Sequence, residues 1–110
     1  MTEILKWASE GEAKVARALV AEILSRNLKI AVKDGEAWTT KITNDEQIIM
    51  KALCSTGEDL VYVFEGEKNL YCGSFWLVYG NADDGLELLA DWSDNELTNE
   101  IVSAIGYMEV

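Results

Sequence analysis

The sequence predicts a single α+β domain over residues 1–110, with an antiparallel sheet of about five strands and helices packed mainly on one face. Segments with a helical apolar repeat lie near both ends and in the middle, and segments that alternate every second residue lie between them, in the order α-β-β-α-β-β-β-α. The last strands are joined by connections too short for a parallel crossover, which indicates antiparallel neighbours. The chain contains no proline, and no linker or internal repeat points to a second domain.

Residues 2–26 are expected to be helical, because apolar residues repeat at a spacing of four along 15–24. Gly11 weakens this helix by about 1 kcal/mol relative to alanine, so the segment can divide into two helices there. Asn27 suits the end of the helix because asparagine tolerates the left-handed backbone conformation.

Two alternating segments, 28–32 and 38–42, flank Asp34-Gly35 and predict a hairpin. A two-residue turn would set their apolar residues on opposite faces. A three-residue loop, Lys33-Asp34-Gly35, pairs Ile30 with Trp38 and Leu28 with Thr40 on one face. We therefore expect the three-residue loop.

The remaining elements follow from capping boxes and apolar runs. Thr43–Glu46 and Ser93–Glu96 each have the capping-box pattern that opens a helix. The run 60–64 is apolar at every position, which is typical of an interior strand or of one covered on both sides. The expected elements are a helix after Thr43–Glu46 that continues to Leu53, strands at 60–64, 70–79 and 86–92, and a last helix whose apolar stripe is Leu97, Ile101, Ala104 and Met108.

Composition excludes several functional classes. Twenty acidic and nine basic residues give a formal net charge of −11, which argues against a basic face for DNA or anionic lipid. Histidine is absent, which removes most triad, metal and acid–base chemistry. No apolar run exceeds five residues, and charged residues interrupt the N-terminal stretch that an export signal needs. We expect no membrane association and a cytoplasmic location.

The negative charge is unevenly distributed along the chain. Residues 1–51 carry eight acids and eight bases, whereas residues 52–110 carry twelve acids and one base, Lys68. Such an asymmetry either keeps the protein soluble or marks a surface that meets a basic partner.

The four tryptophans differ in their expected roles. Trp38 and Trp76 lie on strand positions consistent with the core, whereas Trp7 and Trp92 are candidates for exposure. An aromatic ring surrounded by acids can anchor a protein interface, although a ring that covers the core edge is an equally good interpretation of Trp92. The candidate partner-binding residues are Asp83, Asp84, Glu87, Asp91, Trp92, Asp94 and Glu96.

No motif indicates catalysis, a cofactor or a firm metal site. Cys54 and Cys72 form no CxxC pair and are expected to be buried free thiols, unless the helix end meets the strand closely enough for a disulfide. The acidic loop 81–85 fails the EF-hand pattern, because required ligand positions fall on Gly80 and Ala82. Two alternatives remain. A weak site for a divalent cation would use Asp83, Asp84, Asp91 and Asp94. A paired-carboxylate site for acid–base chemistry would use Asp91, Asp94 and Glu96.

The stretches GEAKVARALVAEIL, ALCSTGEDLVYV and LVYGNADDGLELLADWSDNE resemble a group of short proteins of tailed bacteriophages and prophages. The segment from Tyr79 to Asn95, with the pattern YGN…D.SDN, is the most distinctive part. The resemblance implies a protein made in the host cytoplasm and supplies no catalytic residues. Small acidic phage proteins often block CRISPR complexes or restriction enzymes by occupying basic nucleic-acid channels.

These observations give two expectations from different classes. The first is a non-enzymatic inhibitor of the DNA-mimic kind, which binds a basic protein and makes no direct contact with nucleic acid. The second is a phage structural or assembly protein, or a homodimeric scaffold. Either could be a monomer or a homodimer, and neither requires a cofactor.

Overall fold

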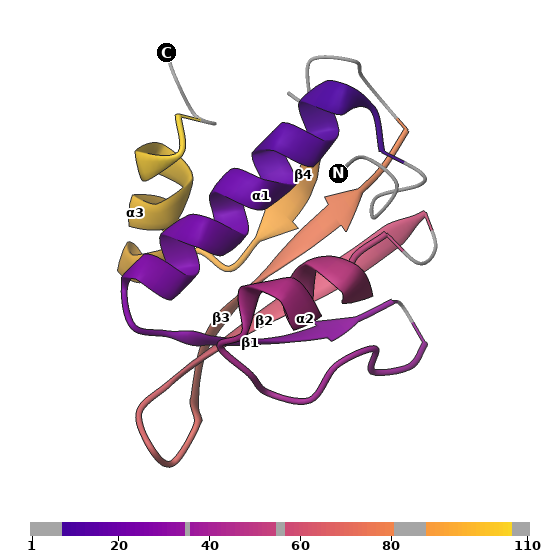
Figure 1. Cartoon of the computed structure of the whole chain (residues 1–110). Helices are drawn as coiled ribbons and strands as arrows, with labels where there is room; N and C mark the ends of the chain where they lie inside the picture. Colours follow the sequence, from indigo (N-terminus) through magenta and orange to yellow (C-terminus); the bar gives the residue numbers. More distant parts are fainter. Residues whose placement is uncertain (1–7, 35, 55–56, 81–87, 107–110) are drawn as a thin grey trace.

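A computed structural model describes residues 8–34, 36–54, 57–80 and 88–106. These residues form an α+β domain with one antiparallel sheet, whose four strands are ordered β1-β2-β3-β4. All three helices lie on the same side of the sheet (Figure 1). The elements in chain order are α1 (Glu10–Ser25), β1 (Lys29–Lys33), α2 (Glu46–Ala52), β2 (Glu58–Glu65), β3 (Leu70–Val78), β4 (Leu89–Trp92) and α3 (Glu96–Ala104).

Of the helix predicted over residues 2–26, residues 2–7 lie outside the described residues, and α1 begins at Glu10. Ser9 is the N-cap of α1 and forms a capping box with Glu12, so the described helix starts at Glu10. Gly11 lies inside the helix without dividing it. Asn27 adopts a φ of 66°, which confirms its predicted left-handed conformation after the helix.

The predicted strand at 38–42 is absent, which reduces the sheet to four strands among the described residues. The bridges in this region join Lys33 to Trp38 and Ile30 to Thr43, so the predicted pairing of Ile30 with Trp38 is wrong. Hydrogen bonds of Asp34 and Thr40 explain the difference. The Asp34 carboxylate accepts from two backbone amides of the turn, and the Thr40 hydroxyl takes the place of a backbone acceptor for the Val32 amide.

The N-caps of both later helices lie two residues after the predicted caps. Asp45 caps α2 and Asn95 caps α3, because the backbones of Thr43 and Ser93 are hydrogen-bonded to the sheet instead. Thr43 exchanges backbone hydrogen bonds with Ile30, and the Ser93 amide donates to a β3 carbonyl. A residue that is still in the strand ladder is not free to cap a helix.

The core lies between the helices and one face of the sheet. β2 is an interior strand as predicted, with Val61 and Val63 wholly buried against the helices. Its other face, with Leu60, Tyr62 and Phe64, is only half-buried, so the strand is not covered on both sides. Other fully buried side chains of the core are Leu19, Ile23, Ile30, Ile49, Phe75, Leu77 and Ile101. No helix among the described residues has both the length and the apolar content needed to cross a membrane.

Candidate functional site

The face of the sheet that points away from the helices carries a cluster of aromatic side chains. The Trp38 ring lies edge-on to Tyr62, with centroids 5.0 Å apart, and Tyr71 lies 6.1 Å from both Tyr62 and Phe64. Trp38 is 54% exposed, Tyr71 is 57% exposed and Trp76 is 40% exposed. Exposed aromatic area of this extent on one face is typical of a binding surface. We call this surface the open face, and it comprises Trp38, Leu60, Tyr62, Phe64, Tyr71 and Trp76.

The predicted burial of two tryptophans is therefore wrong. Trp76 alternates with Phe75 and Leu77, both wholly buried, so its own side chain must point to the opposite face. Trp38 follows the irregular turn after β1 and packs on Tyr62 from the open side. The predicted alternation of side chains holds around Trp76 in β3. Because both faces of the strand carry apolar residues, the alternation does not tell which face packs against the helices.

A β-bulge brings Tyr71 onto the open face. The register between β2 and β3 shifts so that Gly73 pairs with Val63 and Tyr71 pairs with Phe64, which leaves Cys72 as the extra residue. Without this residue Tyr71 would point to the helix side. The bulge also leaves the Cys72 side chain half-buried rather than buried as predicted.

Shallow hollows lie on both sides of the aromatic cluster. An apolar hollow of about 300 Å³ is lined by Ala31, Trp38, Thr40, Lys41, Ile42 and Phe64. Beside β4, a hollow of about 270 Å³ is lined by Leu60, Ser74, Trp76, Asp91, Trp92 and Ser93. These concavities suit protruding side chains of a partner better than a small substrate, because both are wide open.

The predicted partner-binding residues are only partly brought together. Asp83, Asp84 and Glu87 lie outside the described residues. Asp91 is exposed on β4 and lies opposite Trp76 on the open face. Asp94 and Glu96 are exposed where α3 begins. Together with Glu100, these residues form what we call the acidic end: Asp91, Asp94, Glu96 and Glu100.

Trp92 does not stand at the centre of these acids. It pairs with Phe75, and its ring packs against the core on the helix side. Its indole nitrogen donates to Asn99 Oδ1 at 3.0 Å, while Asn99 Nδ2 donates to Asp94 at 3.1 Å. Trp92 is half-buried and therefore fits the core-edge interpretation. Asn99, which links the ring to the acidic end, was not among the predicted binding residues, and no sequence motif marks it.

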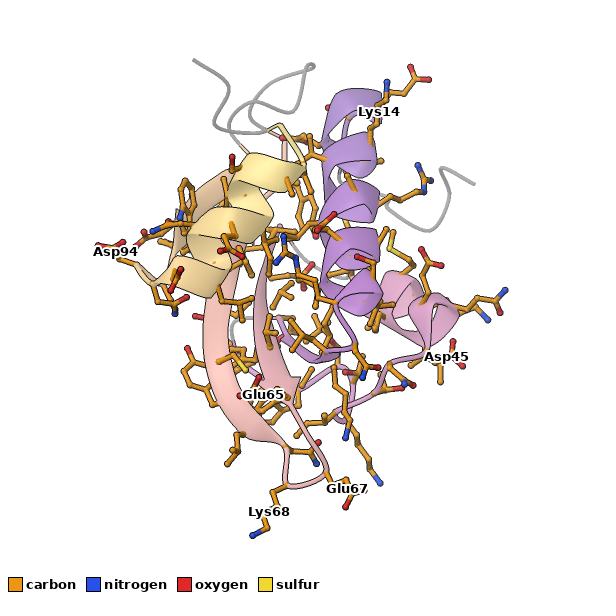
Figure 2. The ribbon with its side chains drawn as sticks, turned by 90° about the vertical axis from the view of Figure 1, so that its left-hand side faces the viewer. Lys14, Asp45, Glu65, Glu67, Lys68 and Asp94 are labelled. Carbon is orange, nitrogen blue, oxygen red and sulfur yellow. The ribbon has the colours of Figure 1, made fainter. Side chains whose placement is uncertain are left out.

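The acids of the second half of the chain lie at separate places. In Figure 2, Asp94 projects beside α3, whereas Glu65 and Glu67 lie near the β2–β3 turn with Lys68. Asp45, from the first half of the chain, lies beside α2 at the opposite side of the molecule from Asp94 (Figure 2). Negative charge is therefore spread over the described surface, with the acidic end as one concentration of it.

Arg26 is the cation at the border of the acidic end. Its guanidinium contacts Glu22 at 2.9 Å and Glu100 at 3.2 Å. The hydrogen bond to Glu22 is the main cause that raises the Arg26 pKa. Asp91, Asp94 and Glu96 form no ion pair with any described residue, so their charge remains available to a partner.

A buried carboxylate lies on the helix side of the sheet. Asp59 is fully buried, and its Oδ2 accepts from the Cys54 amide at 2.6 Å and from the Tyr79 hydroxyl at 2.7 Å. Desolvation raises the Asp59 pKa to about 6, although both hydrogen bonds oppose the shift. Because the group is closed off from solvent, it bears on stability rather than on binding.

The described residues offer little for metal or thiol chemistry. They contain no group of three or more Cys, Asp or Glu side chains placed to hold a metal ion. Cys54 and Cys72 are free thiols, and burial is the main cause that raises the Cys72 pKa. A raised pKa makes a thiol less reactive at neutral pH.

Comparison with known proteins identifies no relative. The chain matches no protein-family model, and no curated protein or solved structure matches it. The surfaces described above are therefore the basis for a functional interpretation.

Proposed function

We propose that the protein is a non-enzymatic binding protein that docks its acidic end on a basic surface of another protein. The observation that carries this proposal is the charge of the segment 88–106, which contains four carboxylates and no lysine or arginine. Three of them, Asp91, Asp94 and Glu96, are exposed and have no ion-pair partner among the described residues.

The fold supports this use of the segment. Asn99 holds Asp94 and Trp92 in a fixed relation, so part of the acidic end is ordered before a partner arrives. Preorganised charge favours fast, oriented association with a surface of opposite sign. A nucleic-acid channel in a host or defence protein is the kind of basic surface proposed, and the resemblance to phage proteins motivates that choice of partner.

We expect a double reversal of charge, Asp94→Lys with Glu96→Lys, to weaken binding at least about tenfold at low salt. The immobilised protein would be exposed to a nuclease-treated host lysate, and a captured protein would then be purified and its affinity measured at two salt concentrations. The wild-type affinity should fall steeply as salt rises, because screening weakens attraction between exposed charges.

The matched control is Glu46→Lys with Glu67→Lys. It changes the net charge by the same amount at two exposed positions away from the acidic end. The control should bind like the wild type. Equal loss in both double variants, or binding that salt does not alter, would show that the acidic end is not the docking surface.

A further inference from the structure

The open face has lysines at its β1 edge and a carboxylate, Asp91, at its β4 edge. A second carboxylate, Glu58 of β2, accepts a hydrogen bond from the Trp76 indole nitrogen at 3.2 Å. One row of paired residues crosses all four strands: Lys33 pairs with Leu60, Leu60 with Trp76, and Trp76 with Asp91. The row therefore begins with a cation on β1, continues through two apolar side chains and ends with a carboxylate on β4.

The cationic edge is held in place by contacts within the open face and the neighbouring turn. The Lys33 ammonium lies 5.6 Å from the centroid of the Trp38 ring. Lys29 lies on the same side of β1 as Lys33, and its ammonium donates to Gly66 and Asn69 of the turn after β2. Both lysines are therefore positioned along one edge of the face.

We infer that the open face binds a second copy of this chain, as a twofold-symmetric dimer with the two sheets face to face. A twofold axis that lies between the sheets and runs along the strands reverses the strand order of the second copy. β1 of one protomer then lies over β4 of the other. Lys33 meets Asp91 of the second copy at both edges, and Leu60 meets Trp76 at the centre.

Self-complementarity favours this occupant over others. A nucleic acid would stack on the aromatic rings, but the net charge of −11 repels phosphate. A uniformly basic or acidic protein would be attracted to one edge and repelled by the other. Only a partner with the reverse order of charges matches both edges, and a second copy rotated by the twofold axis has that order.

The area of the open face indicates how tightly the dimer should associate. Four strands about 4.8 Å apart, over about six residues each, give a face on the order of 400 Å² in projection. The accessible area of such a patch exceeds its projection, because side chains add relief, so the face is at or below the roughly 800 Å² of accessible surface per partner in standard interfaces. We therefore expect a dissociation constant in the micromolar range, so that the dimer depends on concentration.

A mixing experiment tests the inference. Lys33→Glu and Asp91→Lys each place like charges at both edges of the homodimer, so each variant alone should be monomeric where the wild type is dimeric. In an equimolar mixture, the introduced glutamate of one variant faces the introduced lysine of the other, and the native Asp91 and Lys33 face each other at the second edge. Sedimentation velocity from roughly 1 µM to 1 mM should therefore show the dimer restored in the mixture alone.

Matched controls are Lys51→Glu and Glu46→Lys, which are exposed on α2, on the helix side of the sheet. Both should dimerise like the wild type, and circular dichroism should show all variants folded. A wild type that stays monomeric over the whole range overturns the inference, as does a mixture that stays monomeric or a single variant that still dimerises. Binding of a fluorescent oligothymidylate by the wild-type face would also overturn it, in favour of a nucleic-acid occupant.

The two proposals share Asp91 and can still be tested separately. Asp94 and Glu96, which test the acidic end, lie outside the row of residues from Lys33 to Asp91. Loss of partner binding without loss of the dimer, or the reverse, therefore separates the two proposals.

Discussion

Replacing Gly73 by alanine should lower the free energy of unfolding by about 2–4 kcal/mol. A β-carbon at this position would lie 2.7 Å from Thr98 Cγ2 and 3.3 Å from Asn95 Nδ2, both at the start of α3. The φ of Gly73 is also +153°, which side chains of L-residues rarely adopt. Clash and backbone strain therefore add, and α3 would have to move away from the bulge in β3. Urea denaturation at neutral pH would measure the loss.

Substitutions at two other glycines separate the effect of the steric clash from the effect of backbone strain. A β-carbon added at Gly57 would meet nothing within 4 Å, so Gly57→Ala should change stability by less than about 0.5 kcal/mol. Gly66 has open space but a φ of +76°, so Gly66→Ala reports strain without a clash. Adding Thr98→Ser to Gly73→Ala removes the clashing methyl group and should recover part of the loss. If Gly73→Ala were as mild as Gly57→Ala, close packing of α3 on the bulge would be excluded.

The sequence predicted elements well where one periodicity dominated. The helix around Val15–Leu24 was clear because its apolar residues repeat at helical spacing, and the strand 70–78 because most of its residues are apolar, aromatic or β-branched. The segment 38–42 alternates as a strand does, but Asp34 and Thr40 use side-chain hydrogen bonds in place of a backbone ladder. Such local competition is not visible in a polarity pattern.

The open face was harder to predict than the elements that form it. Leu60, Tyr62 and Phe64 lie opposite Val61 and Val63, so both sides of β2 are apolar and the pattern does not tell which side the helices cover. The bulge at Cys72 then reverses the alternation for Tyr71, and the polarity pattern does not show it. Gly73, beside the extra residue, is its one mark in the sequence, because a glycine inside a strand often accompanies a bulge. One signal was present: an antiparallel α+β order favours helices on one face of the sheet, which leaves the apolar residues of the other face uncovered.

For the acidic residues, the sequence shows how many charges the chain carries, but it does not show which of them lie together on the surface. Asp91 and Trp92 are adjacent in sequence but lie on opposite sides of β4, since neighbouring residues in a strand alternate. The exposed aromatic beside Asp91 is Trp76, which comes from another strand.

Asp59→Asn should reduce the pH dependence of stability by about 3 kcal/mol between about pH 3.5 and pH 7. Burial raises the Asp59 pKa from 3.8 to about 6 in the folded protein, whereas the unfolded chain keeps the ordinary value. Over that window the folded state binds more protons than the unfolded state, so the wild type loses stability as the pH rises. An amide does not titrate, and the variant therefore avoids this loss.

The quantity to measure is the difference in unfolding free energy between variant and wild type at each pH. An amide in place of a carboxyl group adds a constant offset, because it changes the hydrogen bonds to Cys54 and Tyr79, but a constant offset does not alter the slope. Glu67→Gln, at an exposed position, is the control, and its difference should vary little with pH. A difference for Asp59→Asn that is flat with pH would mean that the carboxylate is well solvated or paired in the folded protein.

Tyr79→Phe tests the cause of the Asp59 pKa shift by raising that pKa further. The Tyr79 hydroxyl donates to Asp59 Oδ2 at 2.7 Å and stabilises the charged form, so it lowers the Asp59 pKa against the effect of burial. Without that hydroxyl the pKa should rise above about 6, and stability should continue to fall at higher pH than in the wild type. The Asp59 Oδ1 atom has no hydrogen-bond partner among the described residues, so of the two donors found there only the Cys54 amide, on Oδ2, would remain. Asp59→Asn therefore removes the pH range over which stability falls, and Tyr79→Phe extends that range to higher pH. A simple packing defect would do neither.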